Sequence, residues 1–368
     1  MAGNDSASAA HAGPAAACNP PVVSPGGVGE GRNDPRLFPP TVGELRIGML
    51  FVDFADVRST ADPGATYEAF VPGAVEWYRN VSYGRLRLVV TPVLRQITLG
   101  GTVSHYRFGQ EAGLRAALQE AVAAADAEVD FSRFHALYLV APFAALGTFG
   151  ASGVLILEQP VRVDGAEIRT LALLFDGPGA ERDFLAHETG HILGLPDLYV
   201  IGQRLTFHRW DIMASAPSNR GLFAWHRWKL GWLDPGQIVC IGARRRVSAT
   251  LTPLERPGGL KAIVLRRGRY AYVAEVRQPV AAGPGRVCKG GVLIYQVEFG
   301  AASGQADIRL LCARGDTGAQ WAWCGPLSSA PFGRGRGEVS RVRAWGLRFE
   351  IKARLRDGSY RIRVAKTR

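Results

Sequence analysis

Residues 187–197 read His-Glu-Thr-Gly-His-Ile-Leu-Gly-Leu-Pro-Asp. The first five of them lie in a longer segment, residues 180–193, for which the sequence predicts a helix. The run Gly177-Pro178-Gly179 precedes this segment, and Gly194 with a proline two residues later is typical of a helix end. The stretch therefore places several polar side chains on one short helix and on the turn that leaves it.

The spacing of these polar residues indicates a catalytic zinc site. His187 and His191 are four positions apart, so both imidazoles can face one metal ion, and Glu188 can reach a water on that ion. Such a site uses three protein ligands and keeps a fourth position for water. Asp197 is the candidate third ligand, since it completes the metzincin spacing with Asp where a third His is commoner. The alternative is that Asp197 only forms the turn after Pro196.

A methionine follows at the expected place. Met213 lies sixteen residues beyond Asp197, in a chain whose other methionines are Met1 and Met49. Metzincins place a methionine turn beneath the metal, so Met213 is the candidate supporting residue, although an isolated Met is more often core filler.

The group that would stabilise the oxyanion is not identified by the sequence. Several metzincins carry a Tyr two residues after the Met, but Ser215 stands there. Tyr199 and His208 are candidates, and packing or surface roles are the alternatives for both.

The chain resembles the immune inhibitor A-like family of bacterial secreted zinc metallopeptidases over roughly residues 43–300. The motifs that carry the resemblance are residues 187–199, Trp210-Asp-Ile-Met213, residues 223–232, Phe51-Val-Asp-Phe54, residues 77–84, Val129-Asp-Phe-Ser132, residues 272–278 and residues 291–297. The resemblance implies a secreted endopeptidase that acts on a protein or peptide. It implies zinc on His187, His191 and Asp197, with Glu188 as the catalytic base. The sequence does not show whether the chain also has calcium sites.

Composition and periodicity predict an α+β fold. With 368 residues, 47% apolar and 21% charged, the chain has the composition of a folded globular protein. Residues 1–42, rich in Ala, Gly, Pro and Ser, are expected to form a flexible leader. Residues 43–235 are expected to form a metzincin-like catalytic domain, a mixed sheet with an antiparallel edge strand, an active-site helix and a methionine turn. Residues 236–368 are expected to form an all-β, sandwich-like domain.

The expected elements of the catalytic part alternate between strands and helices. Strands are expected at 45–53, 86–93 and 137–141, helices at 67–80 and 114–127, and a hairpin at 154–163 and 168–175 that turns at Asp164-Gly165. The uncharged run 136–157 contains Pro142 and three glycines, so it suits a strand and a loop better than a transmembrane helix.

The expected β part is strongly basic. Residues 236–368 hold 25 of the 44 Lys and Arg but only 8 of the 32 Asp and Glu. This excess suits contact with an anionic surface, with no signal for a specific nucleic acid, and a merely soluble arginine-rich surface is the alternative. Strands are expected at 262–265, 270–276, 291–297, 347–355 and 360–364.

The five cysteines contain no Cys-x-x-Cys pair, and Cys312 with Cys324 would suit a disulfide. The N-terminal residues show no signal peptide, so secretion is an expectation from the resemblance alone. Two other functions remain open. The β part could be a binding module attached to a degenerate protease, although intact Glu188 argues against it. The zinc site could instead hydrolyse a non-peptide or glycoprotein substrate.

Overall fold

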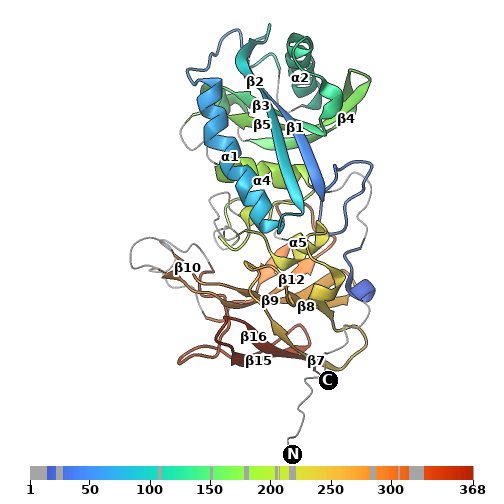
Figure 1. Cartoon of the computed structure of the whole chain (residues 1–368), viewed down its shortest axis with the longest axis vertical. Coiled ribbons are helices and arrows are strands. Elements are labelled where there is room, and N and C mark those ends of the chain that lie inside the picture. Colours follow the sequence, from blue (N-terminus) through green and yellow to red (C-terminus); the bar gives the residue numbers. More distant parts are fainter. Residues whose placement is uncertain are drawn as a thin grey trace, which may run out of the picture. The chain divides into compact units, whose positions relative to one another are not determined.

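The structure is a computed structural model of the chain. It describes residues 15–21, 28–106, 110–149, 152–177, 182–203, 206, 208–214, 221–281, 287–305, 307–314 and 327–367 (Figure 1). The fold is α+β, and the chain forms two compact units. Unit 1 comprises residues 1–21, 198–209 and 223–368, and unit 2 comprises residues 22–197 and 210–222.

Unit 2 contains the mixed sheet that the sequence predicts. Its strand order is β2-β1-β3-β5-β4. The strands β1 (Gly43–Asp53), β2 (Leu86–Thr98), β3 (Ala136–Ala141) and β5 (Ala166–Phe175) run parallel, and β4 (Gly153–Val163) pairs antiparallel with β5 at the edge. Asp164 and Gly165 form the β4–β5 turn with positive φ values of 50° and 70°. The prediction of an antiparallel edge strand is confirmed.

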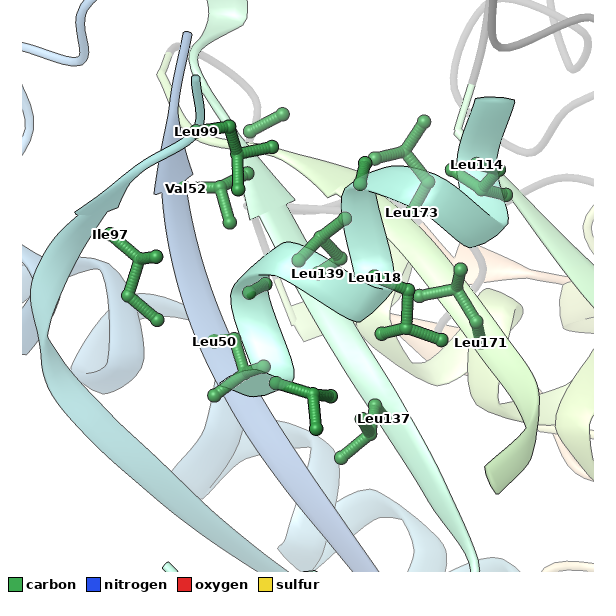
Figure 2. Close-up of a cluster of buried hydrophobic side chains, with 14 of the residues drawn as sticks. Leu50, Val52, Ile97, Leu99, Leu114, Leu118, Leu137, Leu139, Leu171 and Leu173 are labelled. Carbon is green, nitrogen blue, oxygen red and sulfur yellow. The ribbon is translucent and has the colours of Figure 1, made fainter. Parts of the chain in front are cut away.

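Helices cover both faces of this sheet. Helix α2 (Glu111–Ala125) contributes Leu114 and Leu118 to a buried cluster on one face, with Leu137 and Leu139 of β3 (Figure 2). Side chains alternate along a strand, so Tyr138 points to the opposite face. There its hydroxyl shares a hydrogen bond of 2.6 Å with Thr189 of helix α4 (Arg182–Ile192). Helix α1 (Pro63–Val81) lies beside α4 on that face (Figure 1).

Unit 1 contains two larger sheets and a short ribbon. One sheet has the order β13-β12-β9-β8-β6 and the other, which is antiparallel, the order β14-β15-β16-β7. Their bounds are β6 Ile238–Cys240, β7 Arg246–Leu251, β8 Ala262–Arg267, β9 Tyr270–Arg277, β12 Gly291–Glu298, β13 Ile308–Leu310, β14 Arg341–Ala344, β15 Leu347–Arg354 and β16 Tyr360–Lys366. The ribbon joins β10 (Val280–Ala281) to β11 (Val287–Cys288). Both larger sheets contribute side chains to one buried cluster.

The compact units differ from the expected division at residues 42 and 235. Helix α5 (Ala224–Lys229) and residues 198–209 belong to the same unit as the β part. Within the expected leader, Phe38 is buried in unit 2, and Cys18 forms a disulfide with Cys240 in unit 1. The composition of residues 1–42 does not predict that Phe38 and Cys18 are held in place, because their contacts are with residues distant in the sequence.

The cysteines also pair differently from the expectation. Cys288 is disulfide-bonded, whereas Cys312 is a free thiol, so the expected pair Cys312–Cys324 is wrong. Cys324 itself lies outside the described residues. Within the described part of the chain, no helix is long and apolar enough to cross a membrane.

Candidate metal centre

Helix α4 carries three of the predicted site residues and is fixed in unit 2 by buried hydrogen bonds. The hydroxyl of Tyr78, from α1, donates to the carbonyl of Ala186 at 2.6 Å. On the same helix, Thr189 bonds to Tyr138 of the sheet. His187 and Glu188 are each only 5% exposed, so the helix presents them in a nearly dry environment. Their orientation is therefore set by the sheet and by α1.

The turn after α4 brings the chain back toward the histidines. Gly194 has a φ of +82°, which L side chains rarely adopt, and a Cβ there would lie 2.5 Å from the Asn33 side chain. The amide of Leu195 donates to the carbonyl of Gly190 at 2.9 Å, and Asn33 Nδ2 donates to the carbonyl of Leu193 at 2.6 Å. The turn requires glycine for both its conformation and its space.

As a result, His187, His191 and Asp197 converge on one point. The two Nε2 atoms are 3.2 Å apart, and Asp197 Oδ1 lies 3.2 Å from His187 Nε2 and 3.3 Å from His191 Nε2. Ligands bound at about 2.0 Å to one tetrahedral ion stand about 3.3 Å from each other. The three atoms therefore have the separation that a tetrahedral zinc site requires.

Backbone carbonyls fix the tautomer of both histidines. His187 Nδ1 lies 2.9 Å from the carbonyl oxygen of Ile212, and His191 Nδ1 lies 2.8 Å from that of Leu195. A carbonyl only accepts, so each Nδ1 carries the hydrogen and each neutral ring offers an Nε2 lone pair. Two lone pairs and a carboxylate oxygen then face one another at hydrogen-bond distance. All three atoms carry negative charge or partial negative charge, so they repel one another unless a cation lies between them.

The pKa values of His191 and Asp197 also show that positive charge is favoured at this point. Burial lowers the pKa of His191, but the hydrogen bond to Asp197 and the charges of Asp197 and Glu188 outweigh burial and raise it. Burial raises the pKa of Asp197, but hydrogen bonds with His187 and His191 outweigh burial and lower it. The donor set of two imidazoles and one carboxylate is one that zinc accepts.

Glu188 is a nearly buried carboxyl beside this group. Burial raises the pKa of Glu188, while the two histidines oppose that rise. Its Oε2 atom is buried and has no hydrogen-bond partner in the part of the chain that the structure describes. A buried carboxylate oxygen without a partner is costly, so it indicates a role toward a water or substrate.

Met213 lies directly under the helix, in the short turn η5 (Ile212–Ala214). A Cβ on Gly190 would lie 2.5 Å from Met213 Sδ, so glycine at 190 leaves the space that the thioether fills. Asp211, a second carboxylate near the methionine, is fully buried, and its Oδ1 accepts from the Met213 amide at 2.9 Å. Asp211 therefore shapes the methionine turn, and Asp197 is the carboxylate beside the histidines.

No family model and no curated protein matches this chain.

Two of the remaining predicted residues belong to the other compact unit. Tyr199 and His208 belong to unit 1, where His208 is buried with its ring 5.5 Å from that of Phe223. Ser215 lies outside the described residues. Nothing in the sequence around Asn33, Tyr78 or Tyr138 points to the helix and the turn that these residues support.

Proposed function

We propose that this chain is a secreted zinc endopeptidase of the immune inhibitor A-like type. The observation that carries the proposal is the convergence of two Nε2 atoms and one carboxylate oxygen at 3.2 to 3.3 Å, beside a buried glutamate. The finer fold expected from the resemblance, a metzincin-like unit followed by a β-sandwich-like unit, belongs to the same proposal. The order of strands and the methionine under α4 support it.

In this proposal, His187, His191 and Asp197 hold the zinc. Bound zinc would supply a Lewis acid that polarises the scissile carbonyl and makes a coordinated water acidic at neutral pH. Glu188 would accept a proton from the attacking water and later donate it to the leaving amine. The hydrogen bonds from both Nδ1 atoms hold the imidazoles in place while the proton moves.

The substrate would lie along the edge strand β4. Within the described residues, β4 pairs only with β5, so the backbone of Val154 to Ile156 has one unpaired edge. An extended peptide can add to such an edge as a further strand. The amides of Glu158 and Gln159 already donate to Glu111 Oε1, at 2.7 and 3.3 Å, so the available edge ends there.

The disulfide Cys18–Cys240 supports the proposal of secretion, since such bonds persist mainly in oxidising compartments. The disulfide supports secretion through redox chemistry, independently of the resemblance to a family of secreted peptidases.

Cleavage of a denatured protein mixture tests the function. The purified, zinc-loaded chain should cut peptide bonds, a chelator should stop the cleavage, and added zinc should restore it. Glu188→Gln is the matched control, because it keeps nearly the same shape and should keep the zinc but lose several orders of magnitude in rate. Mapped cut sites that persist with chelator, or in the Glu188→Gln protein, would overturn the proposal. Zinc-loaded protein that cuts nothing would favour a non-peptide substrate or a binding module.

A further inference from the structure

The sheet β14-β15-β16-β7 of unit 1 has two chemically opposite faces. Phe349, Ile351 and Ile362 belong to the buried cluster that this sheet shares with its neighbour. Residues that alternate with the buried ones point away from that cluster. They form what we name the cationic face: Arg246, Arg341, Arg343, Arg348, Lys352, Arg361 and Arg363, with Glu350 as the acidic member.

The strand register places one pair of arginines directly opposite each other on this face, and it places Glu350 opposite Arg341 on β14 and Arg363 on β16. Arg343 is directly opposite Arg348 across β14 and β15, and like charges in that relation destabilise a sheet. Glu350 lies within 3.3 to 3.8 Å of Arg348, Lys352 and Arg363, so three cations share one carboxylate. A sheet that needed only solubility would mix the two signs. The arrangement indicates a surface that is stabilised by an anion from outside.

An open cavity adjoins the cationic face at the β14–β15 turn. It measures about 690 Å³, and its lining includes Arg343, Trp345, Arg348 and Lys366 but no acidic residue. Trp345 has a φ of 52°, an unusual conformation for a bulky residue. Its ring stacks on Tyr272, with centroids 5.4 Å apart and planes 27° from parallel. Trp345 therefore packs against the buried cluster to which Tyr272 belongs, and it lines the cavity together with Arg343 and Arg348.

We propose that the cationic face and this cavity bind an acidic polysaccharide. Arginine forks match sulfate and carboxylate oxygens, and the apolar face of a sugar ring can pack on an aromatic ring such as Trp345. On β7, Ser248 and Thr250 share the outward face and can bond to sugar hydroxyls. Neighbouring rows along a strand are about 6.7 Å apart and neighbouring strands about 4.8 Å apart, so the face can engage several charged units of one chain.

Two other anionic partners fit the face less well. Single-stranded nucleic acid is usually bound through several aromatic platforms that stack successive bases, whereas the outward positions of these four strands hold no aromatic residue and the adjoining cavity is lined by one, Trp345. A membrane surface favours large apolar side chains that insert between lipids, and the same positions hold none. The proposal concerns unit 1 alone, so it does not depend on the metal site of unit 2.

Binding of heparin oligosaccharides to the full chain tests this proposal. The double variant Arg343→Gln with Arg348→Gln should raise the Kd for a dodecasaccharide at least about tenfold, because it removes two charge-assisted contacts. The matched control, Arg133→Gln with Arg336→Gln, makes the same change in net charge at exposed positions outside the sheet and should leave the Kd within about twofold. A tetrasaccharide should bind more weakly than the dodecasaccharide, since it spans fewer rows.

A further variant separates binding from folding. Arg343→Glu places a carboxylate directly opposite Arg348. The melting temperature of this variant should therefore equal or exceed that of the unaltered protein, while its heparin binding falls. Equal loss of binding in the control pair would overturn the proposal, because the surface would then act only through net charge. Duplex DNA or anionic vesicles that bind as tightly as heparin, with the same response to Arg343→Gln and Arg348→Gln, would also overturn it.

Discussion

Asp197 brings negative charge to the candidate metal group of His187, His191 and Asp197, and the sequence alone leaves a turn-forming role open for it. Asp197→Ala should lower zinc affinity by more than about a hundredfold, since a whole ligand is lost. Asp211→Asn should keep zinc affinity, because an amide oxygen can still accept from the Met213 amide. Competition titrations against a chromophoric chelator would measure both. Tight zinc in Asp197→Ala together with loss in Asp211→Asn would reverse the assignment.

Lys261 is a buried cation whose titration should appear in the stability of unit 1. Burial, followed by the charges of Arg227 and Arg256, lowers its pKa to about 8. Its Nζ donates to the carbonyls of Pro253 and Arg256. The unfolded chain binds this proton more tightly than the folded one, so the free energy of unfolding should gain a rising contribution between about pH 8 and pH 10.5.

Lys261→Met tests this contribution, since it removes the titrating group and keeps a long side chain. Denaturant unfolding at pH 7.5 and at pH 10 should show the difference between the two proteins growing in favour of the unaltered chain as the pH rises. A constant difference would mean that the folded-state pKa of Lys261 is close to its ordinary value.

The sequence identifies His187, Glu188 and His191 because their relation is local: helical geometry alone fixes which side chains share a face. Asp197 is also close enough in sequence to be proposed. The residues that support the site, by contrast, are distant from it in the sequence. Tyr138 reaches α4 from the sheet and Asn33 reaches the turn from a distant segment, and neither contact follows from spacing along the chain.

At the scale of elements, α4 and the turn η5 act as one packed unit. Gly190→Ala should destabilise unit 2 by about 1 to 3 kcal/mol, because its Cβ would overlap Met213 Sδ. Met213→Leu should cost less than about 1.5 kcal/mol, since the volumes are similar. In a double-mutant cycle measured by denaturant unfolding, Gly190→Ala should cost clearly less in a Met213→Ala background. Costs that add without coupling would show that the two residues do not compete for space.

The elements that the sequence predicts well are those with local signals. Asp164-Gly165 predicts the β4–β5 turn because the common type I′ hairpin loop needs two positive φ values, which Asp-Gly readily adopts, and both are present. The alternating burial of β15 and β16 follows from their period of two. Residues 28–42 show the limit of this approach. Their Pro- and Gly-rich composition predicts a flexible segment, yet Glu30 and Phe38 are buried because tertiary contacts override local preference.

At the scale of the whole chain, the two units hold different chemistry. Unit 2 contains the candidate metal ligands His187, His191 and Asp197, and unit 1 contains the cationic face. Seven of the 25 Lys and Arg in residues 236–368 lie on this one sheet face. Sequence composition could locate the excess charge in residues 236–368 but could not show that Arg343 and Arg348 are paired across strands.

The disulfide Cys18–Cys240 gives a test of this division, because both cysteines belong to unit 1. The bond closes a loop with a sequence separation of 222, so it removes much conformational freedom from the unfolded chain. Cys18→Ser with Cys240→Ser should therefore destabilise unit 1 by roughly 2 to 5 kcal/mol. Hydrogen exchange should accelerate in β7, β8 and β16, while β3 and β5 keep their protection and the zinc affinity of His187, His191 and Asp197 stays unchanged. Parallel loss of zinc affinity and of protection in β3 would show instead that the two units unfold as one cooperative structure.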